Sequence, residues 1–258
     1  MTSDALPAGA YLLRRTADTP PVHRLFCFPY AGGGAGSYFG WRRLLPADIE
    51  LVAIQLPGRE NRLRETLASE MVGVVSNIVV EMESLLDRPY SFFGHSFGAL
   101  LAYECCVALQ RAGHTGPGHM VASGANPPGW TQRLSPQVVV DLALARLRER
   151  FGWHNADEMD PDITALSLQV LRADLDMMLH HCFAQAVMPL HLTVLGATDD
   201  PIVSPEALRH WASFSMSHDL VLTTGGHFFV DAQAERIAEL LMARVPGRTA
   251  AGGSCTAL

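Results

Sequence analysis

A serine between two glycines, at the junction of an apolar strand and an apolar helix, constrains this chain more than any other feature. Residues 94–98 read Gly-His-Ser-Phe-Gly. Tyr90, Phe92 and Phe93 before them are typical of the end of a buried strand, and apolar residues recur at helical spacing from 100 to 109. A turn this tight strains the serine backbone, and the glycines leave room for the adjoining strand and helix. The pattern predicts a nucleophile elbow, which presents a serine hydroxyl at the carboxyl edge of a sheet.

Strands and helices alternate around this segment. Short apolar runs predict strands at 25–28, 51–56, 120–122, 190–195 and 220–222, besides the strand that ends at the elbow. Apolar spacing predicts a helix over 71–86 as well as the one after the elbow. The alternation predicts an α/β fold with a mostly parallel sheet covered by helices on both faces. With 258 residues, 48% of them hydrophobic, one such domain with an insertion is expected.

The alternation stops between residues 128 and 189, where two helical segments follow each other without a strand. In a hydrolase such an insert usually covers the active site as a lid that shapes a substrate channel, and core padding is the alternative. We therefore divide the chain into an extended lead-in (1–22), a core (23–127 and 190–246), a helical lid insertion (128–189) and a tail (247–258). The tail is rich in Gly, Ala, Ser and Thr, so we expect it to be disordered.

Composition argues against several classes of protein. The net charge of −7 disfavours a nucleic-acid binder, and the absence of lysine removes Schiff-base, Ser-Lys and P-loop chemistry. The N-terminus does not resemble a signal peptide, and no apolar run reaches membrane-spanning length. Five cysteines without C-x-x-C spacing fit a cytoplasmic protein. Since the adjacent His180 and His181 point in different directions on a helix, we expect no metal site. We also expect no cofactor, no nucleic-acid partner and no membrane partner, and we favour a monomer.

Two later strand ends supply an acid and a histidine. Asp199 and Asp200 follow one of them, and His227 follows the other after two glycines. Open α/β sheets place their sites at this edge. We choose Asp200 because Pro201 holds it extended, and Asp199 is the alternative. The chain order Ser96, Asp200, His227 is that of α/β-hydrolases rather than of other serine-protease folds.

A glycine-rich loop, Tyr30 to Gly34, follows the first predicted strand of the core. It fits no nucleotide-binding pattern, and a plain turn is the alternative. Beside a nucleophile elbow, such a loop is expected to supply an oxyanion-hole donor. We expect the two donors to be the backbone N–H of Phe97 and that of Ala31, with Tyr30 as the alternative to Ala31.

Six motifs together resemble the type II thioesterases of polyketide and non-ribosomal peptide synthesis. They are FPYAGG (28–33), LPGRE (56–60), GHSFGA (94–99), LRAD (171–174), DP (200–201) and GGHFF (225–229). The resemblance spans nearly the whole chain and implies an α/β-hydrolase fold with a helical lid. It also implies hydrolysis of acyl thioesters on the phosphopantetheine arms of acyl or peptidyl carrier proteins, mainly to clear stalled or aberrant acyl groups.

Residue by residue, the resemblance implies that Ser96 is the nucleophile, His227 the general base and Asp200 its orienting acid. Two positions depart from the family pattern: Tyr30 stands where histidine is usual, and Phe97 where methionine is usual. Both bulkier side chains are expected to reshape the acyl site.

Charged residues carry two further expectations. The run from Arg59 to Arg62 is interpreted as a solvated loop rather than a ligand site. Because carrier proteins are acidic, the lid arginines are candidate rim contacts, with a solvated helix face as the alternative. These arginines are Arg133, Arg146, Arg148 and Arg150.

Three other functions remain open on the sequence. A chain-releasing thioesterase or cyclase differs in the acyl chain that it removes fastest. A carboxylesterase or lipase turns over oxygen esters as readily as thioesters. A degenerate hydrolase fold that only binds would leave Ser96 unreactive, and the full set of serine, acid and histidine argues against it.

Overall fold

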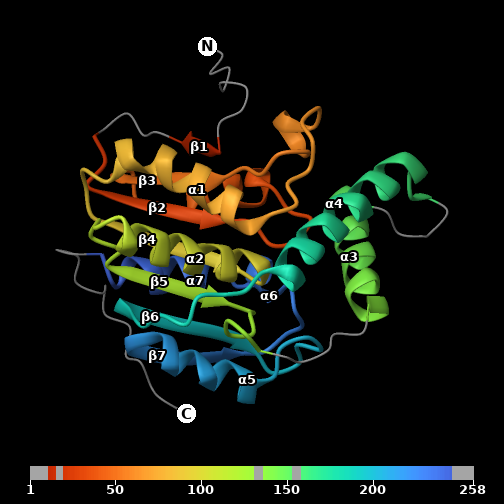
Figure 1. Cartoon of the computed structure of the whole chain (residues 1–258). Coiled ribbons are helices and arrows are strands. Elements are labelled where there is room, and N and C mark those ends of the chain that lie inside the picture. Colours follow the sequence, from red (N-terminus) through yellow and green to blue (C-terminus); the bar gives the residue numbers. More distant parts are fainter. Residues whose placement is uncertain (1–10, 16–19, 131–135, 153–157, 246–258) are drawn as a thin grey trace.

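The computed structural model describes residues 11–15, 20–130, 136–152 and 158–245. A seven-stranded sheet in the order β1-β3-β2-β4-β5-β6-β7 runs through its centre (Figure 1). The strands are β1 (Leu12–Arg15), β2 (His23–Phe28), β3 (Ile49–Ile54), β4 (Tyr90–His95), β5 (His119–Ser123), β6 (Met188–Ala197) and β7 (Ser215–Thr223). Strands β2 to β7 pair in parallel, so their carboxyl ends share one edge.

The first strand differs from the expectation. Residues 12–15 lie inside the predicted lead-in, yet they form β1 and pair antiparallel with β3. The run Leu-Leu-Arg-Arg is too short for a clear alternation, and its pairing depends on a partner about forty residues away. An antiparallel edge strand on an otherwise parallel sheet is common in large α/β folds.

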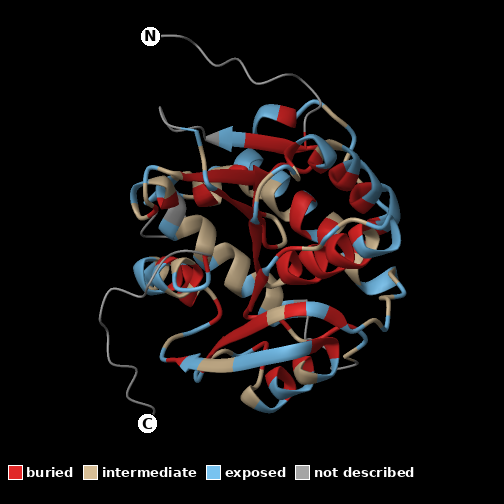
Figure 2. Cartoon of the chain, turned by 90° about the vertical axis from the view of Figure 1, so that its left-hand side faces the viewer, coloured by how far each residue is buried: buried red, intermediate tan, exposed pale blue. Residues whose placement is uncertain are grey.

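Helices cover both faces of the sheet, as predicted. One face packs against α1 (Met71–Met82), α2 (Phe97–Arg111) and α5 (Pro205–Arg209), and the other against η1 (Ala35–Arg43), α6 (Phe229–Ala232) and α7 (Ala234–Met242). Short 3₁₀ turns lie at η2 (Glu60–Arg62), η3 (Glu83–Leu85) and η5 (His210–Phe214). Figure 2 shows the central strands buried between these two layers. Two covered faces explain why the strands read as continuous apolar runs instead of alternating.

The predicted insertion contains two helices, α3 (Pro136–Phe151) and α4 (Pro161–His180). The side chain of Asp160 caps α4 by accepting the N–H groups of residues 162 and 163, and Pro161 occupies the first turn. Both helices lie beyond the carboxyl edge of the sheet (Figure 1). Strand β6 starts at Met188, two residues before the expected Leu190. In the described ranges no helix is long and apolar enough to cross a membrane. The tail (247–258) lies outside the described residues.

Candidate active site

Ser96 occupies a strained turn between β4 and α2. Its backbone has φ 53° and ψ −122°, a conformation that residues other than glycine rarely adopt. The Ser96 N–H donates to the carbonyl of Ser123 at 2.8 Å, and its own carbonyl accepts the N–H of Ala99 at 3.0 Å. These bonds tie the turn to the neighbouring strand and to the helix, so the strain is held in place.

The two glycines of the elbow are required by close backbone approach. A Cβ on Gly94 would lie 2.3 Å from the carbonyl oxygen of Gly98. A Cβ on Gly98 would lie 2.2 Å from the carbonyl oxygen of Phe28, on the adjacent strand. Because both obstacles are backbone atoms, neither can move aside as a flexible side chain could.

The structure brings the predicted histidine and acid to this serine. His227 Nε2 lies 3.0 Å from Ser96 Oγ, and His227 Nδ1 lies 2.8 Å from Asp200 Oδ2. The side chains of His227 and Asp200 are 4% and 0% exposed. With the proton on Nδ1, the acid holds the ring so that Nε2 can accept the serine proton.

Asp200, rather than Asp199, contacts the histidine. The second oxygen of Asp200 accepts the N–H groups of Ile202 at 2.8 Å and Val203 at 3.2 Å, and these bonds fix the carboxylate. Asp199 is exposed, and its carboxylate accepts instead from Thr198 Oγ1 and from the Gly225 N–H.

A second histidine, His95, lies beneath the site. It is fully buried, its Nδ1 lies 3.0 Å from Ser123 Oγ, and its ring is 5.1 Å from that of His227. Burial and the neighbouring His227 lower the pKa of His95 well below its usual value, so its ring is neutral. It therefore adds no competing charge beside the catalytic candidates.

The glycine loop lies beside Ser96, as the elbow motif suggests. Tyr30, Ala31, Ser96 and Phe97 line one cavity. Helix α2 starts at Phe97, so the Phe97 N–H is one of those that no intrahelical carbonyl accepts. Ala31 and Phe97, the expected oxyanion donors, thus line the same cavity as Ser96, and their roles remain predictions.

The charged run from Arg59 to Arg62 departs from the expected solvated loop. Arg59 and Arg62 are each only 5% exposed, whereas Glu60 and Asn61 face solvent. Arg59 makes a two-bond ion pair with Asp174 of α4, with distances of 2.6 and 2.7 Å. The prediction from sequence was wrong because the neighbouring residues show only a charged segment after Pro-Gly. The partner of Arg59, Asp174, lies 115 residues further along the chain.

Comparison with known proteins agrees with this geometry. The family model for the thioesterase domain matches residues 23–245 of this chain. The chain is a member of the thioesterase family. It is 32% identical over 248 residues to a probable cadicidin biosynthesis thioesterase of Streptomyces griseus, covering 94% of this chain and 68% of that one.

Two more relatives agree with the family, and the solved one of them supports the α/β-hydrolase fold. The antimetabolite synthetase AmbE of Pseudomonas aeruginosa is 30% identical over 247 residues, which span 93% of this chain but only 12% of the synthetase. The solved RedJ thioesterase from the prodiginine pathway of Streptomyces coelicolor superposes with a TM-score of 0.77 at 31% identity, over 90% of this chain and 95% of that one. The resemblance carried by the motifs is thus confirmed at the level of the family.

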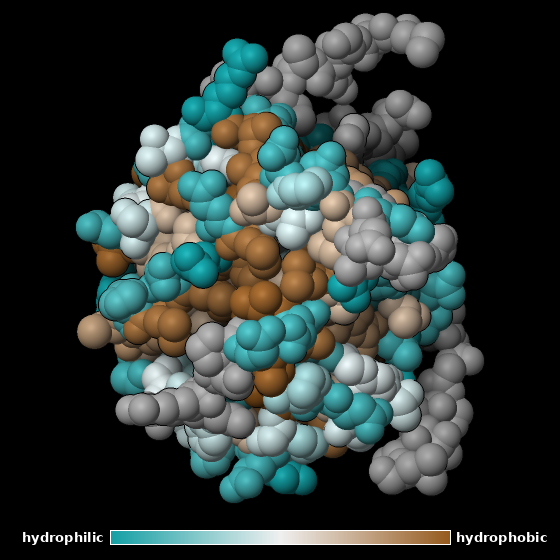
Figure 3. All heavy atoms as spheres, turned by 90° about the vertical axis from the view of Figure 1, so that its right-hand side faces the viewer, coloured by the Kyte–Doolittle hydropathy of each residue, from teal (hydrophilic) through white to brown (hydrophobic). Residues whose placement is uncertain are grey.

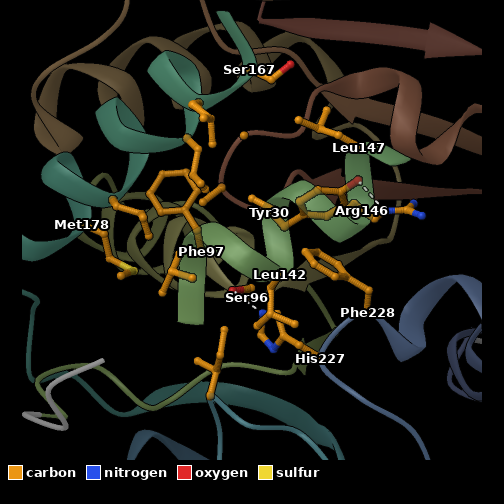
Figure 4. A pocket seen from close by; sticks show the side chains of 18 residues that line it. Tyr30, Ser96, Phe97, Leu142, Arg146, Leu147, Ser167, Met178, His227 and Phe228 are labelled. Atoms are coloured by element: carbon orange, nitrogen blue, oxygen red, sulfur yellow. Dashed lines mark hydrogen bonds between the residues drawn. The ribbon is translucent and has the colours of Figure 1, made fainter. Parts of the chain in front are cut away.

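The cavity of the thioesterase lies between the elbow, the glycine loop and the two insertion helices. Its volume is about 80 Å³. Figure 4 shows Ser96 and His227 at one end, Met178 on one side, and Tyr30 with Arg146 on the other. From α3 and α4 it is lined by Val139, Leu142, Ala143, Arg146, Leu147, Ser167, Leu168, Leu171, Leu175 and Met178. Apolar side chains also gather on the face that carries these helices (Figure 3).

Besides Ser96, His227 and Ser167, two polar residues line this largely apolar cavity, Tyr30 and Arg146. Arg146 Nε lies 3.4 Å from the Tyr30 hydroxyl, and its guanidinium pairs with Asp231 at 2.8 Å and with Glu149 at 3.0 Å. Burial lowers the pKa of Arg146, but the Tyr30 hydroxyl, Asp231 and Glu149 together outweigh it, so the pKa is raised. Because its charge is already paired, Arg146 is a poor candidate for the rim contact expected from sequence. Arg148 contacts Met159, while Arg133 and the side chain of Arg150 lie outside the described part.

A metal centre has no ready set of ligands in this part of the molecule. Across the described ranges, no three His, Cys, Asp or Glu side chains are grouped so that they could hold an ion. His181 pairs with Glu104 at 3.4 Å, and His180 Nδ1 bonds the Asp176 carbonyl at 2.7 Å.

Proposed function

We propose that this thioesterase is a type II editing enzyme that clears acyl groups from the phosphopantetheine arms of acyl or peptidyl carrier proteins. The observation that carries the proposal is the hydrogen-bonded series Ser96, His227 and Asp200, whose first two members line a largely apolar cavity. The names of the relatives, which include a cadicidin biosynthesis thioesterase and a prodiginine-pathway thioesterase, support the class of pathway.

In the first step Ser96 Oγ attacks the thioester carbonyl while its proton passes to His227 Nε2. Asp200, buried and bonded to Nδ1, stabilises the imidazolium that forms. The tetrahedral intermediate then collapses, the C–S bond breaks, and the proton on His227 passes to the departing sulfur. The product of this step is an acyl-serine.

In the second step water enters and His227 takes its proton as the oxygen attacks the acyl-serine. The ester C–O bond breaks, Ser96 recovers its proton, and the acyl group leaves as a carboxylic acid. In both steps the negative oxygen is held by the N–H groups of Phe97 and Ala31, and one such donor is typically worth about 3–4 kcal/mol.

The cavity indicates which acyl groups fit. One buried water molecule occupies about 10–15 Å³ when cavity volumes are measured in this way. A cavity of about 80 Å³ therefore holds roughly five to eight atoms or small groups the size of a water molecule. The lining is mainly Leu, Val, Ala and Met side chains, which favour an apolar chain. A short, unbranched acyl group is the best match, and a bulky ester is a poor one.

The insertion helices that line the cavity beside Ser96 support a carrier-protein partner. A thin phosphopantetheine arm reaches a serine beneath such helices more readily than a bulky substrate does. The net charge of −7 opposes long-range attraction to an acidic carrier. Since Arg146 is paired internally, contact with the carrier rests mainly on apolar side chains of the lid surface, such as Leu166 and Leu179.

The decisive test is the substitution Ser96→Ala, with Ser84→Ala, an exposed serine on η3, as control. Hydrolysis of a butyryl carrier-protein thioester, followed by intact-protein mass spectrometry, should fall by several orders of magnitude only in Ser96→Ala. A fluorophosphonate probe should label wild type and not this variant. Substantial hydrolysis by folded Ser96→Ala would refute the mechanism.

A substrate panel separates the proposed function from its alternatives. The same acyl group should be removed faster from a carrier protein than from a minimal pantetheine mimic or an oxygen ester. Equal rates on the mimic would exclude the carrier-protein partner, and equal rates on the oxygen ester would indicate a general carboxylesterase. Preference for one long pathway product would indicate chain release.

A further inference from the structure

A buried carboxylate on insertion helix α4 has no part in the mechanism above. The Asp174 side chain is 1% exposed and forms a two-bond ion pair with Arg59 at 2.6 and 2.7 Å. Its Oδ2 also accepts the backbone N–H of Gly32, in the glycine loop, at 2.8 Å. One side chain of the insertion therefore reaches directly into the loop that supplies an oxyanion donor.

Arg59 holds the same loop from the core side. Its Nη1 donates to the carbonyl of Gly33 at 3.0 Å, and its own backbone carbonyl accepts from Gln55 Nε2 at 2.9 Å. Gln55 in turn accepts the N–H of Ala35 at 2.7 Å. The pair Asp174 and Arg59 is thus fixed at both ends. The Gly32 N–H and the Gly33 carbonyl are bonded to the pair itself, and the Ala35 N–H is bonded to Gln55, which supports Arg59.

These bonds determine the direction of the Ala31 N–H. The Tyr30 carbonyl shares a planar peptide unit with that N–H and accepts from Gly33 N at 2.9 Å, so the unit cannot rotate freely. The next unit carries the Gly32 N–H that Asp174 accepts, and two units further along is the Gly33 carbonyl that Arg59 holds. Gly32 itself has φ +79°, a conformation that glycine adopts readily.

Helix α4 also makes an apolar contact with the loop, through Leu171. A Cβ on Gly32 would lie 3.4 Å from the Cβ of Leu171, one turn before Asp174. Loop and helix are therefore in direct contact, and a displacement of α4 would release Gly32.

We propose that Asp174, paired with Arg59, is a positioning residue that aims the Ala31 N–H at the developing oxyanion, so that catalysis requires α4 to be seated on the glycine loop. The proposal rests on the proposed function, because it concerns the oxyanion hole of that reaction. Substrate that wedges α4 away from the loop would be bound and not hydrolysed. Seating of the helix then acts as a check on the size of the acyl group.

The test must separate positioning from stability. Asp174→Asn alone leaves the Arg59 guanidinium buried and unpaired, which threatens folding by itself. The double variant Arg59→Met, Asp174→Leu removes both charges and keeps apolar volume, a replacement that folded proteins often tolerate. Glu50→Gln is the matched control, because Glu50 is buried and paired with Arg24 at the opposite edge of the sheet.

In the double variant, kcat for a butyryl pantetheine thioester should fall about 10- to 100-fold, somewhat less than the loss of a complete oxyanion donor. KM should stay within about threefold, since the acyl cavity keeps its apolar walls. Affinity for an alkyl boronic acid, whose adduct with Ser96 places an oxygen in the oxyanion hole, should fall by the same factor as kcat/KM. Glu50→Gln should lower the melting temperature and leave kcat and boronate affinity unchanged.

A folded double variant with wild-type kcat and boronate affinity would overturn the positioning role and leave the proposed function intact. Failure of the double variant to fold shifts the test to Asp174→Asn and Arg59→Lys, assayed below their melting temperatures, with the same readouts. A wild-type enzyme that neither hydrolyses thioesters nor reacts with fluorophosphonate would overturn both proposals.

Discussion

Gly98 and Phe28 approach so closely that a Cβ on Gly98 would lie 2.2 Å from the Phe28 carbonyl oxygen. Gly98 lies in the first turn of the elbow helix, and Phe28 ends the strand that leads into the glycine loop. This contact between α2 and β2 fixes the distance between the two segments that are expected to supply oxyanion donors. Because Gly98 has no side chain, α2 and β2 can approach this closely, and the spacing of the two segments depends on it.

Gly98→Ala should lower the free energy of unfolding by about 3 kcal/mol or more, because the new methyl group meets backbone that cannot yield. Gly73→Ala is the matched control: Gly73 is exposed in α1, and a Cβ added there would meet nothing within 4 Å. It should raise stability by about 0.5–1 kcal/mol through helix propensity. Urea denaturation of both variants checks the prediction, and equal effects would contradict it.

Asp200→Asn should lower kcat by about four orders of magnitude, as the loss of an orienting acid does in a serine triad. The amide would favour the wrong tautomer of His227 and would not stabilise the imidazolium. Asp199→Asn provides a neighbouring control, because its carboxylate is exposed and bonds Thr198 and Gly225 instead. Steady-state hydrolysis of one thioester decides between them. A similar loss in both variants would mean that Asp200 has no special role.

Ala143→Phe should shorten the acyl cavity, because Ala143 lines it from α3. We expect kcat/KM for an octanoyl thioester to fall at least about tenfold relative to kcat/KM for a propionyl thioester. A hydrophobic pocket commonly discriminates by that much or more between substrates that differ by one methylene group. Ala145→Phe, on the exposed side of the same helix, should change neither value. An unchanged chain-length profile in Ala143→Phe would show that acyl chains bind elsewhere.

Hydrogen exchange should be slower in α4 than in α3. Helix α4 buries Val170, Leu171, Asp174 and Met177, whereas the described side chains of α3 are exposed or half-buried. The sequence predicts a mobile lid over the whole insertion, and the packing now restricts the expected motion to α3. Exchange measured by mass spectrometry, with and without an acyl-serine, tests this. Equal protection of the two helices would contradict it.

The unfolding free energy should fall as the pH drops below about 6.5, partly through His119. Burial lowers the pKa of His119 to about 3, so between these values the unfolded chain binds a proton that the folded chain does not. The slope is up to about 1.4 kcal/mol per pH unit. His119→Gln, which keeps a polar partner for Thr193, should flatten the curve, and exposed His218→Gln should not. Parallel denaturation curves from pH 5 to 6.5 would contradict this.

The sequence by itself determined the features that depend on neighbours along the chain. The glycines around Ser96 predict a tight strand-to-helix turn, and the continuous apolar runs predict strands covered on both faces. Asp200 and His227 could be placed because parallel strands bring their carboxyl ends to one edge, whatever the distance between them in sequence. Short strand β1 was missed, since a run of four residues carries too little periodicity.

Only the tertiary structure decided which distant charges meet. Arg59 follows a Pro-Gly turn and has the local pattern of a solvated loop, yet it is buried by a carboxylate 115 residues later, on the insertion. Arg146 has the pattern of a surface arginine and instead pairs with Asp231 beside the cavity. Nothing local encodes such pairs, because the energy of a buried ion depends on the partner and the low dielectric that packing supplies.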